Sequence, residues 1–112
     1  DRMSAVDVTA LERLTELSGD REFVRSLLTE FRTEAASLVA QLRQDDSDTV
    51  RRNAHSLKSA AASVGLTRLS AAAAELERAA SGADGGQLVA RVADVEREWP
   101  VALTALERLR DW

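Results

Sequence analysis

Apolar residues recur three and four positions apart along almost the whole chain, with polar residues between them. This spacing predicts a first helix over residues 8–17, where Thr9 and Glu12 have the separation of a capping box. A second helix is predicted to run to about residue 44, with Asp20 as its N-cap. The apolar stripe of this second helix consists of Val24, Leu27, Phe31, Ala35, Leu38 and Leu42.

Two shorter amphipathic segments follow. A third helix is predicted over residues 48–64, with Gly65 as its stop, and Thr67 is the expected cap of a fourth. Residues 82–86 contain three glycines and form the one obvious loop. The predicted apolar positions are Val50, Ala54, Leu57, Ala61 and Val64 in the third helix, and Leu69, Ala73, Leu76 and Ala80 in the fourth.

From residue 87 onward an apolar seam keeps its spacing across Pro100, which favours one bent helix over two separate ones. The seam is formed by Leu88, Val92, Val95, Trp99, Ala102, Leu106 and Leu109, and Trp99 is expected in the core. Strand signals are nearly absent. Short connections make successive helices antiparallel, so we expect an all-α fold: an up-down antiparallel four-helix bundle with a short accessory N-terminal helix and a Pro-kinked last helix.

Length and composition narrow the class of protein. The 112 residues suffice for one core, so residues 1–112 are expected to form a single domain. No stretch is apolar enough for a membrane span or signal peptide, and we expect a cytoplasmic protein. The absence of cysteine excludes disulfides and thiol chemistry. Because the chain begins at Asp1 rather than Met, we expect it to be a piece of a longer protein.

The one histidine of the chain lies in the stretch RRNAHSLKSAAASVG, residues 51–65. On the third helix His55 points about 160° away from Leu57, so its ring should be exposed to solvent. Arg51, Arg52 and Lys58 lie one turn away. These cations favour the neutral, nucleophilic form of the ring and would compensate the charge of an arriving phosphoryl group.

Other chemistries at this histidine are poorly supported. A serine hydrolase needs a carboxylate to orient the ring, and the flanking turns supply cations and Ser59 instead. One histidine without cysteine cannot form a zinc site, so no metal is expected. A dimerisation helix of a sensor kinase has an acidic residue directly after its histidine, where this chain has Ser56.

The segment resembles the histidine phosphotransfer (HPt) domain family of bacterial and plant phosphorelays. The motif of that family is His, any residue, Leu, Lys, a small residue, and Gly ten positions after the His. His55, Leu57, Lys58 and Gly65 match it. The resemblance covers nearly the whole chain, including the upstream stretch GDREFVRSLL and the downstream stretch RLSAAAAELE.

The resemblance implies a role for each matching residue. His55 would accept the phosphoryl group, Lys58 would steady it, and Gly65 would shape the helix end. The chain departs from the commonest pattern at Ser59, usually Gly, and at Ser63, often Asn. Both replacements are small, so they bear on partner choice more than on the histidine. Partner docking is expected at Arg51, Arg52, Ser59 and Ala62.

The function implied is a relay of a phosphoryl group between receiver-domain aspartates in a two-component phosphorelay. The expected partners are receiver domains of response regulators or hybrid histidine kinases. The chain would be a carrier without turnover of its own, monomeric and without a cofactor, because the receiver supplies Mg²⁺. A non-catalytic adaptor that binds receivers is the alternative. Nucleic acid is disfavoured by the net charge of -4 and would have to contact a local patch of Arg51, Arg52, Lys58 and Arg68.

Overall fold

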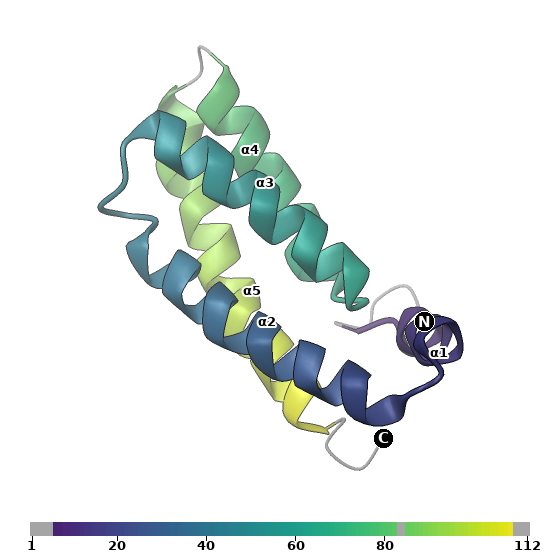
Figure 1. Ribbon diagram of the computed structural model, residues 1–112. Coiled ribbons are helices and arrows are strands. Elements are labelled where there is room, and N and C mark those ends of the chain that lie inside the picture. Colours follow the sequence, from purple (N-terminus) through teal and green to yellow (C-terminus); the bar gives the residue numbers. More distant parts are fainter. Residues whose placement is uncertain (1–5, 83–84, 109–112) are drawn as a thin grey trace.

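The computed structural model describes residues 6–82 and 85–108. This part of the chain contains helices and no β-strand. The elements are α1 (Val8–Ser18), α2 (Arg21–Gln41), α3 (Ser47–Ser63), α4 (Thr67–Ser81), the short 3-10 helix η1 (Gly85–Gln87) and α5 (Leu88–Arg108). The helices α2 to α5 run alternately up and down as an antiparallel bundle (Figure 1). The expected all-α bundle with an accessory first helix is confirmed.

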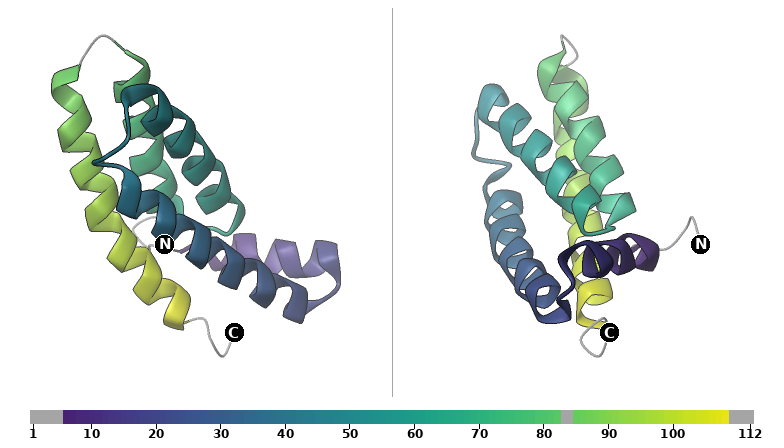
Figure 2. Two further views of the ribbon diagram at one scale, coloured as in Figure 1. Left: turned by 60° about the vertical axis from the view of Figure 1, so that its left-hand side comes forward. Right: turned by 45° about the vertical axis from the view of Figure 1, so that its right-hand side comes forward.

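Helix α1 lies across one end of the bundle, beside the turn between α3 and α4 (Figure 2). Leu11 holds it there, because the side chain of Leu11 is fully buried in the common core. Burying a leucine side chain contributes about 1.5–3 kcal/mol. The backbone N–H of Asp7 also donates to the carbonyl of Gly65 in that turn. The accessory helix is therefore attached to the end of α3 by both packing and hydrogen bonding.

The N-cap of α2 is the residue predicted from the sequence, whereas the N-caps of α1 and α4 differ from the predicted ones. The N-cap of α1 is Asp7, whose carboxylate accepts from the backbone N–H of Thr9; the capping box expected at Thr9 is wrong. Asp20 caps α2 as predicted. Helix α4 has no side-chain cap, because Leu66 rather than Thr67 occupies its N-cap. There the backbone N–H of Thr67 donates to the Gly65 carbonyl, so the turn itself satisfies this donor.

The connection between α2 and α3 begins earlier than expected. Helix α2 ends at Gln41 rather than at residue 44, although the next residue, Leu42, stays buried in the core. Asp46 then caps α3 by accepting from the backbone N–H of Thr49 at 2.8 Å. This hydrogen bond lowers the pKa of Asp46 below its ordinary value. An ionised Asp46 is also favourable at the positive end of the helix dipole.

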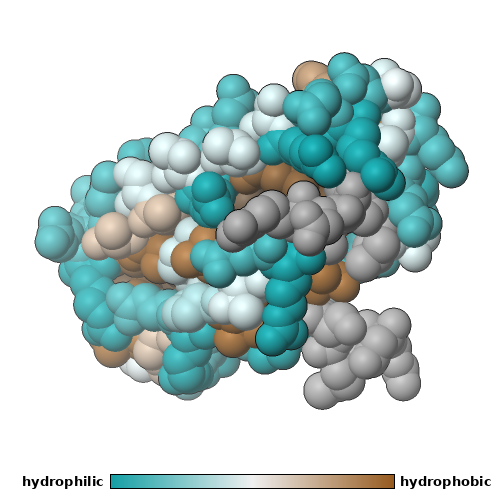
Figure 3. Space-filling view, turned by 90° about the horizontal axis from the view of Figure 1, so that it is seen from below, coloured by the Kyte–Doolittle hydropathy of each residue, from teal (hydrophilic) through white to brown (hydrophobic). Residues whose placement is uncertain are grey.

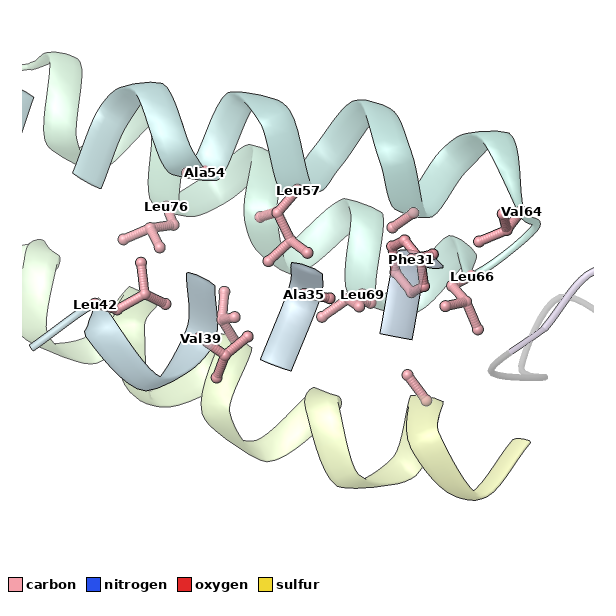
Figure 4. Close-up of a cluster of buried hydrophobic side chains, with 14 of the residues drawn as sticks. Phe31, Ala35, Val39, Leu42, Ala54, Leu57, Val64, Leu66, Leu69 and Leu76 are labelled. Atoms are coloured by element: carbon pink, nitrogen blue, oxygen red, sulfur yellow. The ribbon is translucent and has the colours of Figure 1, made fainter. Parts of the chain in front are cut away.

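One hydrophobic core receives side chains from all five α-helices. Leucine, valine, alanine and Phe31 side chains from α2, α3 and α4 point toward one another in it (Figure 4). Val39 is buried in this core, whereas Leu38, expected on the stripe, is half-buried against it. Trp99 is also half-buried rather than buried, and it packs edge-on against Phe31 with ring centroids 6.3 Å apart.

Helix α5 continues through Pro100 as a single helix, as expected from its seam. Leu109, the last position of that seam, lies outside the described residues. Two ion pairs join α5 to its neighbours, one from Arg43 to Glu96 and one from Arg68 to Glu98. The Glu96 carboxylate accepts two side-chain N–H groups of Arg43, which raises the pKa of that guanidinium.

One face of the molecule is mostly polar. On the face seen from below, hydrophilic residues cover most of the molecule and hydrophobic residues show mainly in the recesses between them (Figure 3). In the part of the chain that the structure describes, the large apolar side chains that remain exposed are Leu17, Phe23, Val89 and Val101. Within residues 6–82 and 85–108, no helix combines the length and apolar character that crossing a lipid bilayer requires.

Candidate functional site

His55 projects from the middle of α3, on the side away from the core. Its side chain is 59% exposed, as the helical phase predicted, while Leu57 on the opposite face is buried. The ring is held from the neighbouring helix: Nδ1 of His55 lies 2.9 Å from Oε2 of Glu77 on α4. The only histidine of the chain is thus both accessible and oriented.

The same carboxylate binds the lysine that follows the histidine by one turn. The Lys58 ammonium lies 2.8 Å from Oε1 of Glu77, so each oxygen of Glu77 has one partner on α3. Glu77 is 24% exposed and Lys58 is 35% exposed, so both side chains are partly shielded from water. His55, Lys58 and Glu77 form a three-residue cluster, which we refer to as the histidine cluster.

The charge of Glu77 is stabilised by both partners. The hydrogen bond from Lys58 lowers the pKa of the Glu77 carboxyl most, and the hydrogen bond from His55 lowers it further against an opposing effect of burial. Glu77 is consequently an anion at neutral pH. An ionised carboxylate only accepts hydrogen bonds.

This fixes the tautomer of the neutral ring. Because Glu77 can only accept, Nδ1 of His55 carries the proton, and this N–H donates a hydrogen bond to the Glu77 carboxylate. The lone pair then resides on Nε2, the other nitrogen of an exposed ring. Carboxylates orient catalytic and metal-binding histidines in the same manner. The histidine cluster therefore leaves Nε2 as the nucleophilic atom of an exposed ring.

The close pairing of α3 with α4 brings these residues together. The two helices lie side by side along their length (Figure 1), and small buried residues of both, Ala54, Ala61 and Ala73, contribute to the core. The hydroxyl of Ser70 on α4 donates to the backbone carbonyl of Lys58 at 2.9 Å. This bond ties α4 to the segment of α3 that carries the site.

Glu77 is a site residue that the motif did not identify: the flanking turns of α3 hold no carboxylate, as the sequence indicated, but α4 supplies one to the ring. The reason is that Glu77 comes 22 residues after His55, on another helix. The sequence did contain a signal: His55 precedes Gly65 by ten residues, and Glu77 follows Gly65 by twelve. In an antiparallel helix pair, residues at similar distances from the turn lie at the same level.

The expected docking residues lie on α3 within about two turns of His55, and they are not part of the histidine cluster. Arg52 is exposed and its guanidinium donates to the hydroxyl of Thr49 on its own helix. Arg51 is half-buried, and Ser59 and Ala62 are exposed. Among the described residues, no hydrogen bond links either arginine to Glu77.

Gly65 lies at the end of α3, away from the histidine cluster, in the left-handed region with φ of 79°. A Cβ atom there would lie 2.5 Å from the backbone oxygen of Asp7. Glycine is thus required both by the turn and by the close approach of the segment that begins α1. Its part in the fold is structural.

The surroundings of the ring do not match the other chemistries considered. No serine hydroxyl in the described part of the chain donates to the ring of His55, so a serine nucleophile activated by this histidine is not present there. Across residues 6–82 and 85–108, no group of three or more His, Cys, Asp or Glu residues could hold a metal ion.

Comparison with known proteins identifies the class to which this fold and site belong. The Hpt domain family model matches residues 22–112, so the chain belongs to the Hpt domain family. Hpt domains are typically phosphoryl carriers. Helix α1 precedes the matched range.

A solved structure shares the whole architecture. It is the crystal structure of histidine-containing phosphotransfer protein B (HptB) from Pseudomonas aeruginosa PAO1, with a TM-score of 0.85 and 23% sequence identity. The alignment covers 97% of this chain and 96% of that one, so the similarity of fold includes α1. No curated protein sequence matches the chain significantly.

Proposed function

We propose that the chain relays a phosphoryl group between receiver-domain aspartates in a cytoplasmic two-component phosphorelay, with Nε2 of His55 as the acceptor. The supporting observation is the exposed ring whose Nδ1 is held by Glu77. Phosphoryl transfer demands positioning and charge stabilisation more than further covalent steps. One oriented imidazole is therefore sufficient on this side of the reaction.

The atoms of the step balance without another group from this chain. The lone pair on Nε2 forms a bond to phosphorus while the bond from phosphorus to the aspartyl oxygen breaks, and that electron pair stays on the aspartate. The ring becomes positively charged, keeps its Nδ1 proton, and continues to donate to Glu77. The reverse step returns the phosphoryl group and leaves a neutral ring, which is a good leaving group.

The remaining residues have supporting roles in this proposal. Lys58 lies one turn from His55 and would balance the charge of the bound phosphoryl group. Arg51, Arg52, Ser59 and Ala62 border the cluster on α3 and would contact the receiver, whose own Mg²⁺ site stays with the receiver. We expect the chain to act as a monomer and a carrier without turnover of its own.

Phosphorylation of His55 can be tested with a panel of receiver domains charged with radiolabelled acetyl phosphate. At least one receiver should transfer acid-labile, alkali-stable label to the chain, and His55→Gln should take up none while remaining folded by circular dichroism. Label that persists on His55→Gln would overturn the site. A receiver that binds without any transfer would instead identify the adaptor function, and no transfer from any receiver would overturn the proposal.

A further inference from the structure

Glu77 engages two groups that the proposed reaction uses in different ways. One oxygen accepts from the His55 ring at 2.9 Å, and the other lies 2.8 Å from the Lys58 ammonium. The ring bond to Nδ1 is compatible with a phosphoryl group on Nε2. The contact with Lys58, in contrast, competes with the phosphoryl group, because an ammonium held by a carboxylate is less available to another anion.

Lys58 therefore has two competing partners once His55 is phosphorylated. It lies three residues from His55 on the same helix, so its flexible stem can bring the ammonium to either the carboxylate or the phosphoryl oxygens. If Lys58 stays with Glu77, the phosphoryl group lacks its cation. If it moves, the half-buried Glu77 carboxylate loses its main partner.

We propose that Glu77, by competing for Lys58, makes phospho-His55 less stable than it would otherwise be and so favours transfer onward to a receiver aspartate. This rests on the proposed relay function and adds to it a determinant of the transfer equilibrium. Glu77 acts through Lys58 and through the orientation of the ring, so it is a positioning residue. Its direct effects on the phosphorylated ring oppose one another, because the carboxylate attracts the ring cation and repels the phosphoryl oxygens.

The substitution Glu77→Gln separates the two contacts. A glutamine carbonyl oxygen can still accept from Nδ1 of His55, whereas its amide group repels the Lys58 ammonium instead of binding it. The nitrogen chemical shifts of the His55 ring, measured by NMR, should therefore show the same tautomer in Glu77→Gln as in the unaltered chain. Lys58 would be free to bind the phosphoryl group.

The test is the equilibrium distribution of label between one receiver and the chain, measured for the unaltered protein, Glu77→Gln, Lys58→Met and the double variant. We expect Glu77→Gln to shift the equilibrium about fivefold toward phospho-His55, and less than about twofold when Lys58 is already methionine. Lys58→Met keeps most of the stem, and thermal unfolding verifies that each variant is folded.

The outcomes distinguish this inference from the function on which it rests. An equal shift in both backgrounds, no shift, or a shift toward the receiver would overturn the competition for Lys58 while leaving the relay function intact. A changed ring tautomer in Glu77→Gln would also overturn it, because the ring contact would then account for the effect. Failure of the unaltered chain to accept label would overturn the relay function and this inference together.

Discussion

At the scale of single residues, the two nitrogens of the His55 ring have different surroundings. Nδ1 is hydrogen-bonded to Glu77, while Nε2 is the remaining nitrogen of a side chain that is largely exposed. The orientation of the ring depends on Glu77, and the nearby positive charge depends on Lys58. Because Glu77 also binds Lys58, substitutions at these two positions should have coupled rather than additive effects on transfer.

We predict that Lys58→Ala slows phosphoryl transfer to His55 about 100-fold, because an electrostatic partner of the transferred group is lost. Single-turnover quench experiments with a phosphorylated receiver measure this rate. Arg68→Ala is the matched control, since Arg68 is similarly exposed but pairs with Glu98 on α5. Equal slowing by both substitutions would show that Lys58 acts only through net charge, and an unchanged rate would remove it from the mechanism.

His55 and Lys58 could be predicted from sequence because they share one helix, and helical periodicity fixes their relative positions. Glu77 belongs to α4, so its distance from His55 depends on how closely two helices pack. The family motif does not encode that distance. The direction of the His55 side chain could be derived from its own element, whereas its hydrogen-bond partner required the tertiary structure.

At the scale of elements, the turn between α3 and α4 also determines where α1 attaches. Gly65 adopts a positive φ, and its carbonyl accepts from the backbone of both Asp7 and Thr67. Gly19, which ends α1, has a similar φ of 71°, but a Cβ atom added there would meet no other atom within 4 Å. These two glycines differ in surroundings and not in backbone conformation.

We predict that Gly65→Ala lowers the free energy of unfolding by about 3 kcal/mol or more, whereas Gly19→Ala lowers it by about 1 kcal/mol. Both substitutions force alanine into a left-handed backbone, but only alanine at position 65 also meets the Asp7 carbonyl. Urea denaturation measures both values, and amide hydrogen exchange should show lost protection in α1 for Gly65→Ala alone. Equal destabilisation by the two substitutions would mean that the Asp7 segment moves away from the added methyl group at no cost in free energy.

The helices themselves were predictable and their caps only partly so. Each apolar stripe indicated a helix, because burial of one face dominates helix stability in a folded protein. Caps depend on individual hydrogen bonds, and both Asp7 and Thr9 could have begun α1. Thr67 is a good cap residue, but the Gly65 turn already satisfies its backbone donor. Tertiary contacts decided between these local options.

At the scale of the whole molecule, the geometry of the histidine cluster depends on the separation of α3 and α4. The separation of two packed helices depends on the size of the side chains between them, and Ala73 on α4 is fully buried. Glu77 follows Ala73 by one turn on the same helix. A larger residue at position 73 would displace α4 and move Glu77 away from the His55 ring.

We predict that Ala73→Leu lowers the free energy of unfolding by about 1–3 kcal/mol and also slows transfer to His55, because overpacking displaces the helix that orients the ring. The ring nitrogen shifts of His55 should then show a mixture of tautomers. Ala71→Leu, at an exposed position of α4, is the control and should alter neither property. A destabilised Ala73→Leu protein with an unchanged transfer rate and tautomer would contradict this coupling.

The three members of the histidine cluster come from two helices joined by one tight turn. The hydroxyl of Ser70 on α4 also donates to the backbone carbonyl of Lys58 on α3, which links the two helices. The remaining helices contribute core packing but no atom to the cluster. Because α1, α2 and α5 supply none of its three side chains, substitutions on the outer faces of these helices should leave the histidine cluster assembled. The α3–α4 hairpin is accordingly the segment in which a change of sequence disturbs the cluster most directly.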